Sequence, residues 1–137
     1  MPFPKPRPSK FPVRVGRTKA GLGLFAVSDI PKNRFIIEYW GDVVTDEEAD
    51  RINGRYLFDL GNGKTIAGGV RKNIARYINH ACRPNARPRQ VGNRIFIFSS
   101  KPIKAGQEIT YNYGKEYADA FIHPHCRCLT CERRKAH

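Results

Sequence analysis

The chain has 137 residues and a net charge of +13, from 25 lysines and arginines against 12 aspartates and glutamates. This length suits one domain with one core, and a hydrophobic content of 40% agrees with a folded chain rather than a disordered one. No apolar run approaches the ~20 residues of a membrane span, and the N-terminus lacks the apolar stretch of a signal peptide. These features predict an intracellular, soluble domain.

The N-terminal segment is basic and rich in proline. Residues 1–20 contain six basic residues and no acidic one, and five of the ten prolines lie within residues 1–12. Proline fixes the backbone in extended conformations and removes hydrogen-bond donors. Residues 1–12 are therefore expected to form a basic, flexible arm outside the core.

Short β-like runs separated by turn residues follow in chain order. Strands are expected at residues 13–15, 24–27, 35–39, 56–60, 94–98 and 108–111. Gly61-Asn62-Gly63 and Gly92-Asn93 are tight-turn signals, and residues 29–33 and 102–106 resemble each other as turns. Helical signals are fewer. Thr45 with the acidic residues after it predicts an N-cap and a helix to about Ile52, and residues 73–79 predict a second short helix. The pattern indicates a mainly β fold of several small sheets with one or two short helices.

Acidic residues gather in the middle of the chain. Residues 41–60 hold six of the twelve acids. An acidic patch on a basic protein could receive a basic peptide. The overall positive charge has two open interpretations, namely solubility alone or attraction to nucleic acid.

The four cysteines are Cys82, Cys126, Cys128 and Cys131, and the last three form a Cys-x-Cys-x-x-Cys cluster. Disulfides are rare inside cells, so clustered cysteines favour a zinc ion. His123 and His125 are competing ligands, although an all-cysteine site suits zinc better.

Several motifs follow one another in a fixed order. They are Gly21-Leu22-Gly23, Ile37-Glu38-Tyr39-Trp40-Gly41-Asp42, RYINHACRPNA from Arg76, EITYNYG from Glu108, and the cysteine cluster. In this order and approximate spacing they resemble the SET-domain protein lysine methyltransferases, over nearly the whole chain from about Val13 to Cys131. The resemblance implies a SET domain at residues 13–114 with a C-terminal pseudo-knot, followed by a zinc-binding tail of the post-SET kind at residues 115–137.

The resemblance also implies roles for individual residues. Tyr113, Tyr111 and Tyr39 would be the catalytic residues, with Tyr113 as the catalytic tyrosine and Tyr111 as the residue that sets how many methyl groups are added. S-adenosylmethionine would be bound by Lys19, Ala20, Gly21, Leu22, Gly23, Tyr56, Arg76, Asn79, His80 and Tyr117. The substrate lysine would enter a channel lined by Tyr39, Tyr56, Phe58 and Tyr111. One structural zinc ion would be held by Cys82, Cys126, Cys128 and Cys131.

The chemistry of methyl transfer suits this set of tyrosines. The lysine must attack as a neutral amine, although its ordinary pKa is about 10.4. A dry aromatic channel disfavours the ammonium and lowers that pKa. We therefore expect methylation of lysine in a basic protein such as a histone, a nucleoid protein or a ribosomal protein, mainly to the monomethyl product.

Two other functional classes stay open from the sequence. One is a non-catalytic, zinc-containing module that binds nucleic acid through its basic surface, and the other is an inactive SET-like interaction domain. The spacing of the cysteine cluster is shorter than is usual in the family, and no cysteine-rich segment precedes the domain. This bare arrangement resembles the stand-alone members of bacteria and viruses. The expected location is the cytoplasm or nucleoid in a bacterium, and the nucleus or chromosome in a eukaryote.

Overall fold

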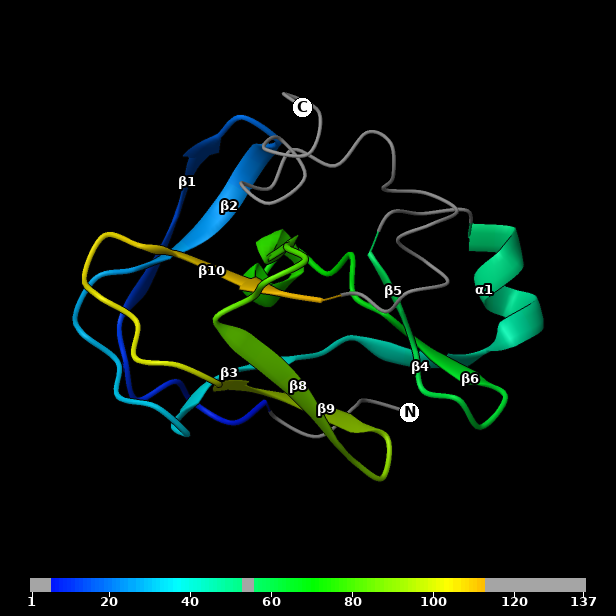
Figure 1. Ribbon diagram of the computed structural model, residues 1–137. Helices are drawn as coiled ribbons and strands as arrows, with labels where there is room; N and C mark the ends of the chain where they lie inside the picture. The colour runs from blue at the N-terminus through cyan, green and yellow to red at the C-terminus, as the bar shows by residue number, and fades with distance from the viewer. Residues whose placement is uncertain (1–5, 53–55, 113–137) are drawn as a thin grey trace.

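The computed structural model describes residues 6–52 and 56–112 of the chain. These residues form short strands, one α-helix and one 3-10 helix (Figure 1). The elements are β1 (Val13–Thr18), β2 (Gly21–Ala26), β3 (Phe35–Tyr39), β4 (Asp42–Thr45), α1 (Asp46–Ile52), β5 (Leu57–Asp59), β6 (Lys64–Ala67), η1 (Ile74–Tyr77), β7 (Asn79–His80), β8 (Ala86–Val91), β9 (Arg94–Ser99) and β10 (Glu108–Tyr111). No helix among them is long and apolar enough to cross a membrane.

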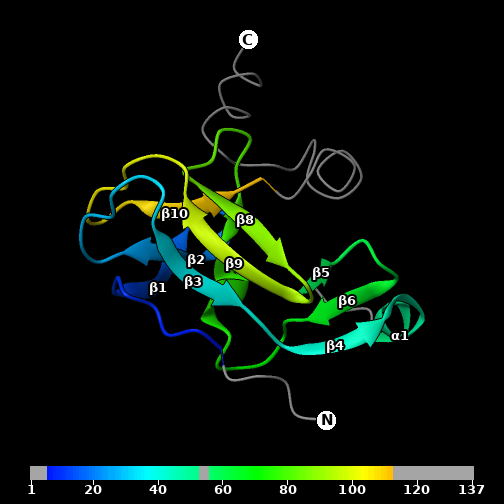
Figure 2. The same ribbon diagram turned by 90° about the horizontal axis from the view of Figure 1, so that it is seen from below.

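The strands form three small sheets. One has four strands in the order β1-β2-β10-β7, and the other two have three strands each, in the orders β3-β9-β8 and β4-β6-β5. Figure 2 shows the β3-β9-β8 sheet next to the β4-β6-β5 sheet, which carries α1 at its side. The apolar faces meet in one core that includes Leu24, Ile36, Ile66, Ile97 and Ile109. The predicted mainly β fold of several small sheets is confirmed.

The helix α1 begins where the sequence predicts. The backbone N–H of Glu48 donates to Thr45 Oγ1 at 3.2 Å, and Thr45 Oγ1 donates to Glu48 Oε1 at 3.1 Å. The Thr45 backbone N–H completes this capping box by donating to the same carboxylate at 3.5 Å. The short helix packs a single buried residue, Ala49, so that its acidic side faces solvent.

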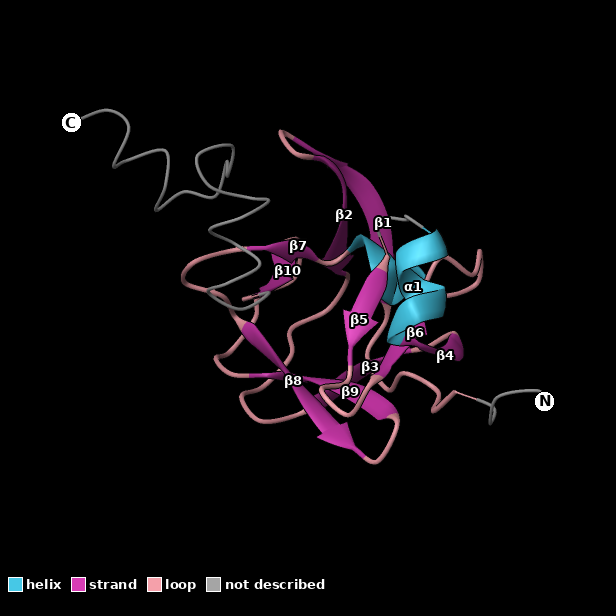
Figure 3. Ribbon diagram, turned by 90° about the vertical axis from the view of Figure 1, so that its right-hand side faces the viewer, coloured by secondary structure: helices cyan, strands magenta, loops and turns pink. Residues whose placement is uncertain are grey.

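The second predicted helix is wrong beyond one turn. Only Ile74–Tyr77 are helical, in a 3-10 turn, and Asn79–His80 form the strand β7. Thr110 and Tyr111 of β10 pair in parallel with β7. Pairing with this distant strand overrides the local helical preference of residues 73–79. Figure 3 shows β7 and β10 side by side.

The hairpin of β8 and β9 turns at Gly92-Asn93 as predicted, with Gly92 at a φ of 61°. No strand was predicted at β8, because arginines and Pro88 interrupt any apolar alternation there. Proline is tolerated there since β8 lies at the edge of its sheet. The two similar turns predicted around Ile30 and Ile103 contact each other, and their backbones exchange hydrogen bonds of 2.7 and 2.8 Å.

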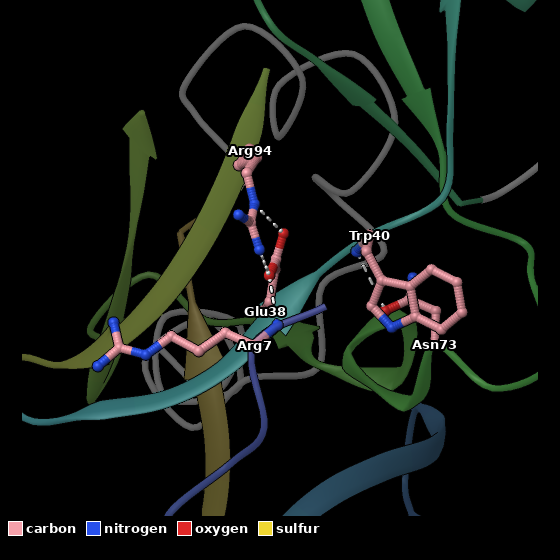
Figure 4. Close-up of polar contacts among 5 residues, drawn as sticks. All are labelled: Arg7, Glu38, Trp40, Asn73 and Arg94. Carbon is pink, nitrogen blue, oxygen red and sulfur yellow. Dashed lines mark hydrogen bonds and ion pairs between the residues drawn. The ribbon is translucent and has the colours of Figure 1, made fainter. Parts of the chain in front are cut away.

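Residues 6–12, which belong to the flexible arm predicted at residues 1–12, contact the domain. The Arg7 backbone N–H donates to Glu38 Oε1 at 2.7 Å, and the Ser9 hydroxyl donates to the Ile36 carbonyl. Phe11 packs against the core. Arg94 binds the same Glu38 carboxylate through two N–H groups (Figure 4). The hydrogen bond with Glu38 raises the pKa of the Arg94 guanidinium.

Candidate active site

Asn79 joins three strands at one point. Its side-chain Nδ2 donates to the Leu22 carbonyl of β2 at 3.0 Å and to Glu108 Oε2 of β10 at 2.8 Å. The residues 21–23 and 79–80 are both predicted to bind the methyl donor, and this contact brings them together. Lys19 and Ala20 form the exposed turn that leads from β1 into β2.

The two glycines of the Gly21-Leu22-Gly23 motif occupy positions that disfavour other residues for different structural reasons. Gly21 begins β2 after the turn, with a φ of 107° that other residues rarely adopt. A Cβ atom on Gly23 would lie 2.6 Å from Glu108 Oε2 and 2.7 Å from Thr18 Cγ2. A side chain at position 23 would therefore require the Glu108 and Thr18 side chains to shift. The family resemblance implies that both glycines bind the methyl donor.

His80 and Cys82 follow directly on the same segment. His80 is buried, and its Nε2 lies 3.5 Å from the Cys82 sulfur. The backbone N–H of Ala81 donates to the Tyr111 carbonyl at 3.2 Å, which keeps this segment against β10. Within residues 6–52 and 56–112, no three His, Cys, Asp or Glu side chains form a metal site. Because Cys126, Cys128 and Cys131 lie outside the described residues, the four-cysteine zinc site stays a prediction.

Three of the four predicted channel residues form one aromatic cluster. The ring centroids of Tyr39 and Phe58 are 5.4 Å apart, and those of Phe58 and Tyr111 are 6.2 Å apart. Tyr39 and Tyr111 are 4% and 5% exposed. A Cβ atom on Gly68 would lie 2.3 Å from the Tyr39 hydroxyl, so glycine is needed where the tyrosine passes.

Tyr56, the fourth predicted channel residue, belongs to a different group. Its ring centroid lies 6.2 Å from that of Tyr77, and the Arg76 guanidinium lies over both rings. Arg76 Nη1 donates to the Gly69 carbonyl at 3.1 Å, and Nη2 donates to the Tyr77 hydroxyl at 2.6 Å. The Arg76 Nε is buried and has no hydrogen-bond partner among the described residues. It is therefore a donor that a bound acceptor could satisfy.

A shallow pocket of about 270 Å³ lies beside Tyr56. Its lining includes Asp42, Ile52 and Gly69. The acidic first turn of α1, with Asp46, Glu47 and Glu48, follows Asp42 closely in the chain. The acids of the predicted patch are thus exposed, and one of them, Asp42, lines the pocket.

The structure also adds residues that sequence reasoning missed. Glu108 accepts a hydrogen bond from the Asn79 side-chain amide, as described above. Asn73 is fully buried, and its side chain donates to the Gly68 carbonyl at 2.8 Å and accepts from the Trp40 N–H at 3.3 Å. The sequence signal available for Asn73 was an asparagine directly before Ile74 and Ala75, which begin η1. Tyr113 and Tyr117 lie outside the described residues.

Comparison with known proteins identifies the family. The family model for the SET domain matches residues 21–114, more than half of the chain. Histone-lysine N-methyltransferase 2D of Homo sapiens is 35% identical over 127 residues, which cover 84% of this chain and 2% of that protein. Histone-lysine N-methyltransferase Set2 of Drosophila melanogaster is 42% identical over 117 residues, which cover 75% of this chain and 5% of that protein.

A solved structure agrees with these relatives. The crystal structure of the Chaetomium thermophilum polycomb repressive complex 2 has a chain that is 35% identical, with a TM-score of 0.71. The match covers 77% of this chain and 15% of that chain. The chain thus spans a small part of the length of the proteins it resembles. From its family match, its sequence relatives and its fold, the chain belongs to the SET-domain family.

Proposed function

We propose that this domain transfers a methyl group from S-adenosylmethionine to the side-chain amine of a lysine in a basic protein. The observation that carries the proposal is the hydrogen bond from Asn79 to the Leu22 carbonyl. It brings together the two segments that the family resemblance assigns to the methyl donor. The relatives named above are called histone-lysine N-methyltransferases, which supports the same reaction.

The residues around Asn79 and Arg76 suit a polar, charged donor. Donor binding would use residues 19–23, Asn79 and His80, with Arg76 and Tyr56 nearby and Tyr117 closing the site. The buried Arg76 Nε is a hydrogen-bond donor that an acceptor group of the ligand can satisfy. When bound, S-adenosylmethionine supplies a methyl group on a positively charged sulfur, which a neutral amine can attack.

The aromatic cluster would prepare the lysine for that attack. Tyr39, Phe58 and Tyr111 are packed together with little exposure at the two tyrosines. Removing water from the lysine disfavours its charged form and lowers its pKa. Tyrosine hydroxyls orient an amine without a full negative charge that would retain the proton. Tyr113 would complete the site as the catalytic tyrosine.

The substrate would be a histone or another basic chromatin, nucleoid or ribosomal protein. Its positive charge complements the exposed acids of α1 and the exposed Asp42, which lines the pocket. Such a substrate places the enzyme at chromatin in a eukaryote or at the nucleoid in a bacterium.

A labelled-donor assay tests this function. The protein is incubated with methyl-labelled S-adenosylmethionine and a panel of histones, nucleoid proteins and ribosomal proteins, and the label is mapped by mass spectrometry. We expect label on a lysine, and loss of most of it with Tyr113→Phe. Donor binding without transfer to any panel member would favour a non-catalytic interaction domain. Absence of donor binding in calorimetry would reject the proposal.

A further inference from the structure

The outer face of the β3-β9-β8 sheet is built of arginine and phenylalanine. We name it the arginine–phenylalanine face, and it consists of Arg7, Phe35, Arg87, Arg89, Arg94, Phe96 and Phe98. Along β9, Ile95 and Ile97 turn into the core with at most 1% exposure, while Phe96 and Phe98 between and after them are partly exposed. The register places Arg87 opposite Phe98 and Arg89 opposite Phe96. Figure 2 shows this sheet toward the viewer.

Each phenylalanine of this face has an arginine over its ring. The guanidinium carbon lies 4.1 Å from the ring centroid for Arg7 on Phe35, 5.1 Å for Arg94 on Phe96, and 5.9 Å for Arg89 on Phe98. Such stacking is attractive and limits the motion of the side chain. A planar guanidinium that is already held in place loses less freedom when it binds a ligand.

The face has a strong excess of positive charge. Glu38 is the one acidic residue in the three strands, and it is buried against Arg94, whose Nη2 lies 2.7 Å from its Oε1. This ion pair cancels one of the four arginine charges. Arg7, Arg87 and Arg89 are exposed. A ligand on this face would therefore meet guanidinium groups that no acid of these strands neutralises.

We infer that the arginine–phenylalanine face binds the phosphate backbone of nucleic acid. Guanidinium groups bind phosphate oxygens through paired N–H groups, and a regular polyanion matches a flat row of them. Arg87 and Arg89 point to the same side of β8, about 7 Å apart along the strand. Guanidinium groups lie over the rings, so the face presents charge more than apolar surface. This favours a polyanion over a protein partner that docks through apolar contacts.

On this inference, two separate surfaces bind different partners. The acidic residues of α1 lie beside the β4-β6-β5 sheet, whereas the basic face belongs to the β3-β9-β8 sheet. A protein that binds nucleic acid on one sheet can meet a basic protein partner at another. Binding to the backbone alone would be independent of base sequence.

Fluorescence anisotropy with a short labelled DNA duplex, at several salt concentrations, tests the inference. The variant Arg87→Gln with Arg89→Gln should weaken binding at low salt by about tenfold or more and reduce the slope of log affinity against log salt by about 2. The control Arg14→Gln with Arg51→Gln removes the same charge from other surfaces, including an arginine stacked 4.7 Å over Phe25. The control should stay within about threefold of the unchanged protein, which is the scatter expected from long-range charge alone.

Three outcomes would overturn the inference. They are equal losses in the two variants, no binding by the unchanged protein at low salt, and tighter binding of polyglutamate than of DNA. Thermal melting monitors folding throughout. If the glutamine variant fails to fold, Arg87→Lys with Arg89→Lys decides, because it keeps the charge but removes the planar fork. That variant should bind more weakly with an unchanged salt slope, and unchanged affinity would contradict a role for the guanidinium groups.

Discussion

Glu38 is a buried carboxylate whose partners come from two distant parts of the chain. It is 4% exposed and accepts from Arg94 Nε at 3.0 Å, Arg94 Nη2 at 2.7 Å and the Arg7 N–H. Arg94→Ala should leave the carboxylate short of donors and lower the free energy of unfolding by about 1–3 kcal/mol. Urea unfolding measures this loss. Arg17→Ala, at an exposed position of β1, is the control. A loss no greater than that of the control would contradict the prediction.

Tyr111 is the residue that we expect to limit the number of methyl groups, on the proposed function. Its hydroxyl can hold the amine, or a water beside it, in the space that a second methyl group needs. The unchanged enzyme should therefore yield mainly monomethyl-lysine. Tyr111→Phe frees that space and should shift products toward two or three methyl groups while activity is kept. Mass spectrometry of a methylated peptide measures the product, and trimethyl-lysine from the unchanged enzyme would refute the restriction.

At the scale of elements, Asn85 acts as an additional strand partner for β10. Its Nδ2 donates to the Glu108 carbonyl at 2.8 Å, and its Oδ1 accepts from the Thr110 N–H at 2.9 Å. Asn85→Ala removes both bonds and should lower the free energy of unfolding by about 2 kcal/mol. Asn85→Asp should cost more, because it sets a carboxylate oxygen against the Glu108 carbonyl. Denaturant unfolding checks both, with the exposed Asn62→Ala as control. Equal stability of Asn85→Ala and the control would contradict the role.

Local signals predicted the elements whose causes are local. The capping box at Thr45 and the turn at Gly92 could be predicted from the sequence because a few neighbouring residues determine them. The strand β8 could not be predicted in this way, since Pro88 fits only because the strand lies at a sheet edge. The same limit applied to residues 73–79, where the parallel pairing of β7 with β10 decided the conformation.

The candidate site was predicted by family resemblance more than by local physics. The motifs indicated that residues 21–23 and Asn79 would lie close together. Only the structure shows that Glu108 contacts both, since its carboxylate lies beside Gly23 and accepts from Asn79. The separation of Tyr56 from the cluster of Tyr39, Phe58 and Tyr111 was also invisible in the sequence, because it depends on how separate sheets pack.

At the scale of the whole molecule, a zinc ion would link the middle of the chain to its C-terminal residues. Cys82 follows β7, and its partly buried sulfur lies beside His80. Thiolate sulfur is the ligand that structural zinc sites favour. We predict one zinc ion per chain, held by Cys82, Cys126, Cys128 and Cys131. Metal analysis of gently purified protein should find it, and chelation should lower the melting temperature, because a metal bound only by the folded state stabilises that state.

A cysteine variant separates this site from adventitious metal. Cys82→Ser removes one of four sulfur ligands and should weaken zinc binding by at least about tenfold, about 1.4 kcal/mol, in a competition assay with a chromogenic chelator. His123→Ala with His125→Ala is the matched control, since these histidines are the competing ligands, and it should retain the zinc. Loss of zinc in the histidine variant with retention in Cys82→Ser would reverse the ligand assignment. Protein that contains no zinc, or a disulfide that includes Cys82, would contradict the metal site itself.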